Sequence, residues 1–81
     1  MTAKKTLGEL RAEIDKIDDR LLELIARRAR IATRIGETKN EGAHSELDVG
    51  RERSVLRRLR DANPGPLSAD AVESVFREII S

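Results

Sequence analysis

The first forty residues carry a hydrophobic pattern of helical period. Apolar residues recur at steps that alternate three and four, so they line one face of an α-helix. They are Leu7, Leu10, Ile14, Ile17, Leu21, Leu24, Ile31 and Ile35. Thr6 and Glu9 form a capping box before this run, and Gly42 is the first good helix stop after it. The pattern therefore predicts one helix from about residue 7 to about residue 40.

Such a helix is too long for a chain of this size. About 34 helical residues span roughly 50 Å. A compact globule formed by all 81 residues is only about 30 Å across. The residues that remain are split by turns and are too few to cover both ends of the rod. The apolar stripe must therefore be buried against another molecule, and we expect an intertwined helical homodimer.

Two shorter helices are predicted in the second half of the chain. Asp48 can cap a helix that contains Val55 and Leu56 and ends near the Asn-Pro-Gly-Pro sequence at residues 63–66. Ser68 can cap a third helix, whose apolar residues have the spacing of a single buried face. These residues are Val72, Val75, Phe76, Ile79 and Ile80.

The predicted fold class is therefore all-α, with three helices in a single domain over residues 1–81. No stretch of the sequence indicates a strand or a repeat. The chain stops at Ser81 while the pattern of the third helix continues. Since Met1 has the character of a natural start, we expect any missing piece at the C-terminus, through truncation, a disordered tail or fusion to another domain.

Charge and composition exclude several classes of function. Sixteen basic and fifteen acidic residues leave a net charge of only +1, which argues against a general polyanion binder. Phe76 is the one aromatic residue, so the chain lacks a stacking platform for single-stranded nucleic acid. The arginine clusters at residues 27–34 and 53–60 nevertheless leave a basic nucleic-acid binder as an alternative.

The sequence contains none of the common signals for metals, disulfides or membranes. It has no cysteine, so it has no disulfide, thiolate nucleophile or zinc-thiolate site. No stretch has metal-ligand spacing or approaches the roughly 20 apolar residues of a membrane span. His44 is the single histidine and falls in a connection, where a surface role is expected. We expect a cytoplasmic protein that needs no metal or cofactor.

Arg28 is the most informative polar position. Arginine outnumbers lysine twelve to four, and its guanidinium suits the recognition of carboxylates. Arg28 lies within the apolar stripe, where a buried cation is costly unless an anion pairs with it. The alternative is that Arg28 snorkels to water or pairs with an internal glutamate. Lys39, eleven residues later, returns to the same face, although alone it would be an ordinary charge at a helix end.

Three further residues are candidates for binding a small anion. Arg51 and Glu52 follow Asp48 in the first turns of the second predicted helix, where backbone N–H groups also point outward. Alternatively, they are a surface charge and a response to the helix dipole. Arg11 borders the stripe but lies about 25 Å from Arg28 along the helix. The two can share a ligand only across an antiparallel dimer; otherwise Arg11 is an exposed arginine.

These residues resemble a known family in their order and spacing. The similarity runs through Leu10-Arg11, Ile14 to Asp18, Leu21-Leu22, Arg27-Arg28, Lys39, Asp48, Arg51-Glu52, the Pro-Gly-Pro-Leu-Ser connection and residues 75–80. In this arrangement the chain resembles the all-helical chorismate mutases, in particular the mutase domain at the N-terminus of bifunctional enzymes that also carry prephenate dehydratase.

The resemblance implies two interlocked chains that share two sites for chorismate. Arg28 of one chain and Arg11 of the other would hold the two carboxylates of the substrate. Lys39 would donate to the ether oxygen of the breaking bond. No cofactor or metal is implied.

The remaining site residues are also implied by the resemblance. Glu52, with the backbone near Asp48, would hold the ring hydroxyl, and Arg51 would support a carboxylate. Two features depart from the family pattern. Ser-Glu-Leu at residues 45–47 replaces the usual proline before the capping aspartate, and the last family site residues would fall beyond Ser81. Alternatives are an isochorismate-pyruvate lyase on the same scaffold and a non-catalytic dimerisation or regulatory module.

Overall fold

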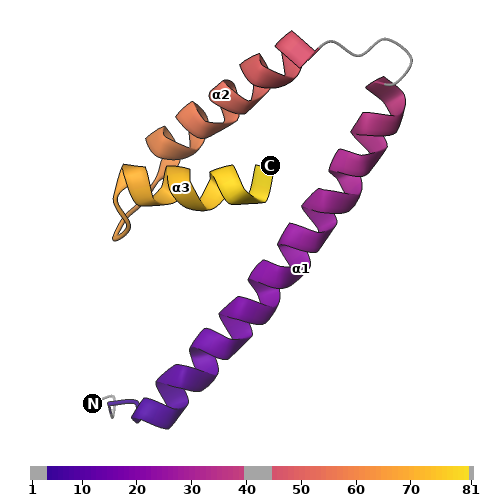
Figure 1. The fold of residues 1–81 in the computed structure, drawn as a ribbon. Coiled ribbons are helices and arrows are strands. Elements are labelled where there is room, and N and C mark those ends of the chain that lie inside the picture. The colour runs from indigo at the N-terminus through magenta and orange to yellow at the C-terminus, as the bar shows by residue number, and fades with distance from the viewer. Residues whose placement is uncertain (1–3, 40–44, 81) are drawn as a thin grey trace. The chain divides into compact units, whose positions relative to one another are not determined.

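The computed structural model describes residues 4–39 and 45–80, and over these ranges it contains helices and no strand (Figure 1). The helices are α1 (Leu7–Lys39), α2 (Ser45–Ala62) and α3 (Ala69–Ile80). The predicted all-α class with one very long first helix is confirmed. The chain divides into two compact units, Met1–Thr38 and Lys39–Ser81. That they form a single domain stays a prediction.

α1 is one uninterrupted helix of 33 residues. Its first turn is closed by the predicted capping box. The Thr6 backbone N–H donates to Glu9 Oε1 at 3.2 Å, and the Glu9 backbone N–H donates to Thr6 Oγ1 at 3.1 Å. The box satisfies two N–H groups that a helix start leaves without an intrahelical partner. The predicted bounds are confirmed, and the predicted stop at Gly42 lies outside the described residues.

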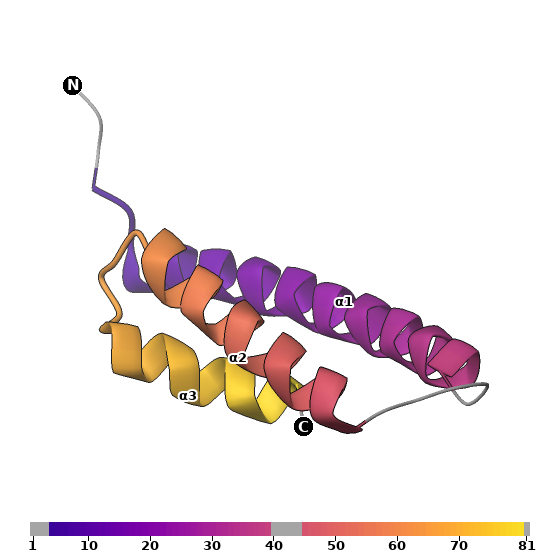
Figure 2. The ribbon, with the colours of Figure 1, turned by 90° about the horizontal axis from the view of Figure 1, so that it is seen from above.

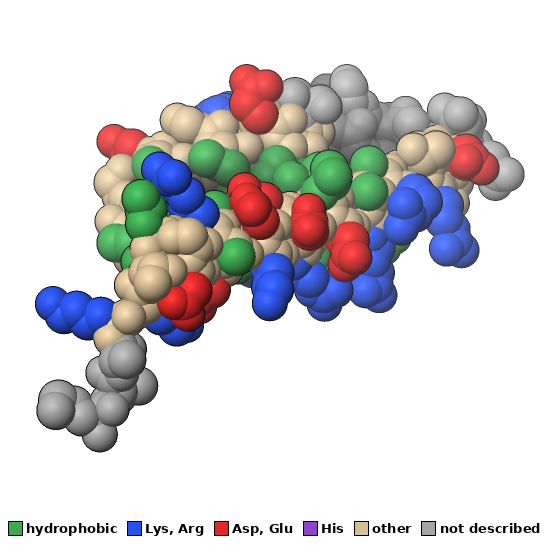
Figure 3. Space-filling view, turned by 90° about the horizontal axis from the view of Figure 1, so that it is seen from below, with side chains coloured by type: hydrophobic (Ala, Val, Ile, Leu, Met, Phe, Trp, Pro, Cys, Tyr) green, Lys and Arg blue, Asp and Glu red, His purple; other side chains and the backbone are tan. Residues whose placement is uncertain are grey.

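The apolar stripe of α1 lies on the surface. Its leucine and isoleucine side chains range from 43% exposed at Leu24 to 63% exposed at Leu7. In the space-filling view, hydrophobic side chains gather in a band on the surface beside acidic groups (Figure 3). An apolar face that runs the length of a helix needs another surface to bury it. The stripe is therefore a candidate surface for a partner.

α2 and α3 form a helical hairpin, in which α3 lies beside α2 in both views (Figures 1 and 2). Asn63 holds the turn. Its side chain accepts a hydrogen bond from the Gly65 N–H at 3.0 Å and donates one to the Leu67 carbonyl at 2.7 Å. Gly65 has φ of 76°, a conformation that favours glycine. Ser68 caps α3 as predicted, because its Oγ accepts from the Ala71 N–H at 3.1 Å.

The start of α2 differs from the prediction. α2 begins at Ser45, so Asp48 is its fourth residue and not its N-cap. The physical reason is that Ser-Glu-Leu at residues 45–47 contains neither proline nor glycine, and these residues continue the helix toward its N-terminus. The end of the helix at Ala62, directly before Asn63 and Pro64, agrees with the prediction.

The hairpin combines a small apolar core with an ion-pair network. Val55 and Leu56 of α2 are only 6% and 4% exposed and are the buried residues of the described part of the chain. Arg60 of α2 donates to Asp70 at 2.9 Å and to Glu73 at 3.3 Å, both on α3. The hydrogen bond to Asp70 raises the pKa of Arg60, so the guanidinium stays charged at any ordinary pH.

The buried position of Leu56 predicts a large effect of truncation. Leu56→Ala should lower the free energy of unfolding by about 2–4 kcal/mol, because it removes methyl groups from a closed core and leaves a cavity. Leu67→Ala is the matched control, since Leu67 is 57% exposed. Urea unfolding followed by circular dichroism, at one fixed protein concentration, measures both. A loss at position 56 no larger than at position 67 would contradict this description of the core.

Candidate active site

The six residues predicted to form a site come from two helices. Arg11, Arg28 and Lys39 belong to α1, and Asp48, Arg51 and Glu52 belong to α2. The side chains of Lys39 and Asp48 lie outside the described residues. Of the other four, Arg28 and Glu52 are half-buried, whereas Arg11 and Arg51 are exposed.

Arg28 lies in the middle of the apolar stripe, between Leu24 and Ile31. It is half-buried, yet it makes no ion pair or hydrogen bond with any residue that the structure describes. Elsewhere on the same helix, charged side chains do pair, as in Arg20 with Glu23 at 3.1 Å. Arg28 is thus a cation at an apolar surface with its donors free. A carboxylate there would meet less competition from water than on the polar face.

Arg11 cannot share a small ligand with Arg28 in one chain. The two residues are separated by about 25 Å along the uninterrupted helix. α1 is drawn as a straight rod in Figure 1, so no bend brings them together. As the sequence predicts, a site that uses both arginines needs two chains.

Lys39 is the last residue of α1. Because the backbone is helical over the whole interval from residue 28, the spacing of eleven residues returns Lys39 nearly to the face that carries Arg28. The Lys39 backbone therefore lies about 16 Å farther along that face. That the two side chains share this face stays a prediction.

Asp48, Arg51 and Glu52 lie within one turn of each other on α2. Because α2 begins at Ser45, the free backbone N–H groups among its helical residues belong to residues 45–47. The fourth residue of a helix already donates to the carbonyl before it, as Leu10 does to Thr6 at the start of α1. The N–H groups of Asp48, Arg51 and Glu52 therefore lie inside the helix. The expectation that outward-pointing N–H groups accompany Arg51 and Glu52 is therefore wrong. Glu52 is half-buried and has no partner among the described residues.

Two hollows formed by described residues of α2 and α3 do not contain the site residues. A hollow of about 680 Å³ on α2 and one of about 290 Å³ between α2 and α3 include none of the six. Among residues 4–39 and 45–80, no group of three potential ligands is placed to hold a metal ion. No helix over the same ranges is both long and apolar enough to cross a membrane. The cytoplasmic location stays a prediction.

The sequence reasoning missed the charged network that joins α2 to α3. Glu73 accepts hydrogen bonds from Arg60 and, within α3, from Arg77, both at 3.3 Å. The available signal was an arginine in the last turn of α2 followed, after a short turn, by acidic residues in the first turns of α3. In a hairpin these positions face each other.

Comparison with known proteins places this arrangement in a family. The profile described as "Chorismate mutase type II" matches residues 10–81. The protein "Bifunctional chorismate mutase/prephenate dehydratase" of Neisseria gonorrhoeae is 43% identical over 81 residues, which is 95% of this chain and 22% of that protein. The protein of the same name from Aquifex aeolicus is 40% identical over 80 residues, which is 93% of this chain and 22% of that protein.

A relative with a different name also matches nearly the whole chain. The "T-protein" of Haemophilus influenzae is 31% identical over 81 residues, which is 99% of this chain and 22% of that protein. The chain thus spans less than a quarter of the length of these relatives. No solved structure gives a significant match. With the family profile covering all but the first nine residues, the chain belongs to the chorismate mutase type II family.

Proposed function

We propose that this chain is a chorismate mutase that converts chorismate to prephenate. Family membership and the names of the relatives support the reaction. The observation that carries the proposal is Arg28, a half-buried cation without a partner among the described residues, in the middle of an apolar helix face. A dicarboxylate is the kind of ligand that such a cation would bind.

The proposed enzyme is a homodimer in which two α1 helices pair in antiparallel fashion. A second copy would cover the exposed stripe of α1 and bring the partner subunit's Arg11 to Arg28. If Arg11 of one chain lies beside Arg28 of the other, the midpoint of the contact between the two helices falls between Asp19 and Arg20. This point is only about 5 Å from the middle of α1, so the two helices would overlap over most of their length. Most of each stripe would then be covered.

The reaction suits a site built from cations. The rearrangement is intramolecular: an ether C–O bond breaks, a C–C bond forms, and no atom leaves or joins. The protein therefore has to hold the reactive conformer and stabilise the charge that develops on the ether oxygen. Arg28 and the partner subunit's Arg11 would clamp the two carboxylates, and Lys39 would donate to the ether oxygen.

The α2 residues complete the proposed site. Glu52 would accept a hydrogen bond from the ring hydroxyl, which fits a half-buried carboxylate that has no other described partner. The backbone near Asp48 would assist, as the family resemblance implies. Arg51 would support a carboxylate from the solvent side, in keeping with its exposure.

The direct test is incubation of the 81-residue chain with chorismate and, separately, with isochorismate. We expect prephenate from chorismate at a rate above the uncatalysed reaction. Salicylate with pyruvate from isochorismate, and no prephenate, would instead identify a lyase. No turnover of either compound by a folded dimer would indicate a non-catalytic helical module.

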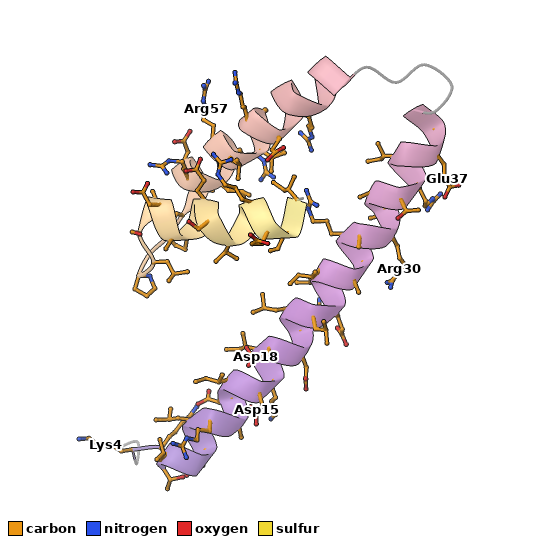
Figure 4. All side chains as sticks on the ribbon, in the orientation of Figure 1. Lys4, Asp15, Asp18, Arg30, Glu37 and Arg57 are labelled. Carbon is orange, nitrogen blue, oxygen red and sulfur yellow. The ribbon has the colours of Figure 1, made fainter. Side chains whose placement is uncertain are left out.

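Arg28→Ala should reduce kcat/KM for chorismate by about 10²–10³, because one carboxylate would lose its clamp. The dimer should remain folded, since the stripe accepts alanine more readily than an unpaired charge. Arg30→Ala is the matched control: Arg30 is an exposed arginine that projects from the same helix (Figure 4). Steady-state kinetics and circular dichroism of both variants provide the measurement. Full activity of Arg28→Ala would contradict the assignment.

Mixing two inactive variants tests whether the site is shared. Arg11→Ala and Arg28→Ala chains, once exchanged, should form heterodimers in which one of the two sites is intact. A random equal mixture should therefore recover about a quarter of the wild-type activity. Native mass spectrometry confirms the exchange. If heterodimers form and activity stays at the level of the separate variants, each site belongs to one chain.

A further inference from the structure

The hollow between α2 and α3 is lined by arginines from both helices. Arg53 and Arg60 come from α2 and Arg77 comes from α3, around a space of about 290 Å³. This volume is near the lower end of the range for small-molecule sites. The hollow lies within one compact unit and contains none of the residues proposed to bind chorismate.

Two of the three acidic groups around this hollow, Asp70 and Glu73, are already engaged. Arg60 binds Asp70 and Glu73, and Arg77 shares the same Glu73. Arg53 forms no ion pair or hydrogen bond with any described residue, although it lines the same hollow. Asp61 also lines it and offsets part of the charge without pairing with a described residue. The four guanidinium groups that line the hollow, counting Arg57, thus exceed the three carboxylates by one positive charge.

The interaction between Arg53 and Arg77 does not stabilise the hairpin. They carry the same charge and line the same hollow, so the interaction between them is repulsive. Arg57 also lines the hollow and adds to its positive charge. An anion between Arg53 and Arg77 would turn this repulsion into attraction.

The floor of the hollow favours binding. Leu56 is 4% exposed and also lines the space. An apolar floor lowers the local dielectric, so a charge-assisted hydrogen bond there is stronger than on an open helix surface. Guanidinium groups on two helices can each present two N–H donors to one oxyanion.

We propose that this hollow is a second anion-binding site, separate from the chorismate site. It would take a small oxyanion, either a phosphate or a carboxylate group, that bridges Arg53 of α2 and Arg77 of α3. Binding would tie α3 to α2 and stabilise the hairpin, since a ligand that binds only the folded state shifts the unfolding equilibrium.

The test is a titration of the isotope-labelled 81-residue chain followed by NMR, with inorganic phosphate and with succinate in separate arms and ionic strength held constant with sodium chloride. We expect saturable shifts at residues 53–60 and 73–77. Saturation by phosphate alone identifies a phosphate site, and saturation by succinate alone identifies a carboxylate site. The Arg28→Ala chain should give the same shifts, which keeps this result independent of the proposed mutase activity.

Variants separate this site from general charge attraction. Arg53→Gln should weaken binding at least about tenfold, the loss expected for one charge-assisted interaction. It should also remain folded, since Arg53 pairs with no described residue. Arg58→Gln is the matched control, because Arg58 lies on α2 outside this hollow. The proposal is overturned if neither anion gives saturable shifts in the hollow, or if Arg53→Gln and Arg58→Gln bind equally well.

Discussion

The constraint on which the molecule depends is an apolar face about 50 Å long that one chain leaves on its surface. The hydrophobic effect requires cover for the leucines and isoleucines of α1, which are at least 40% exposed. We propose a second α1 as the partner, since it matches in length and pattern. The proposed site follows from this requirement, because Arg28 lies within the same face. In the proposed dimer, the surface that favours association would also carry the cation that binds the anionic substrate.

In the proposed dimer, Arg28 would have a functional use that offsets the free-energy cost of placing a cation in an apolar interface. A leucine at position 28 would continue the stripe and would bury more apolar area. Arginine at this position would instead keep a positive charge inside the proposed interface. Exclusion of water from the interface would strengthen its interaction with a carboxylate. A reaction that needs only a held conformer and a stabilised oxygen is suited to such fixed charges. Glu52 of α2, the other residue proposed for this site, is likewise half-buried and has no described partner.

Features with local causes were predictable from the sequence. The Thr6–Glu9 capping box, the end of α2 before Asn63 and the Ser68 cap each follow from hydrogen bonding between residues a few positions apart. The prediction that Asp48 is the N-cap of α2 was wrong, because nothing in residues 45–47 stops the helix from beginning a turn earlier. The Arg60–Glu73 contact depends on how the hairpin closes, which spacing alone does not specify. The residues of the proposed site were inferred from family spacing, and its assembly from two chains stays a prediction.

The most direct test of the central claim is a pair of spin-label distances between two copies of the chain. The sequence has no cysteine, so Asp19→Cys and Glu37→Cys each give one labelling position, and both residues are exposed on α1. An antiparallel pair that joins Arg28 to the partner subunit's Arg11 predicts about 20–30 Å between labels at position 19 and about 50 Å between labels at position 37. Similar short distances at both positions, or no dipolar coupling at either, would contradict the shared site.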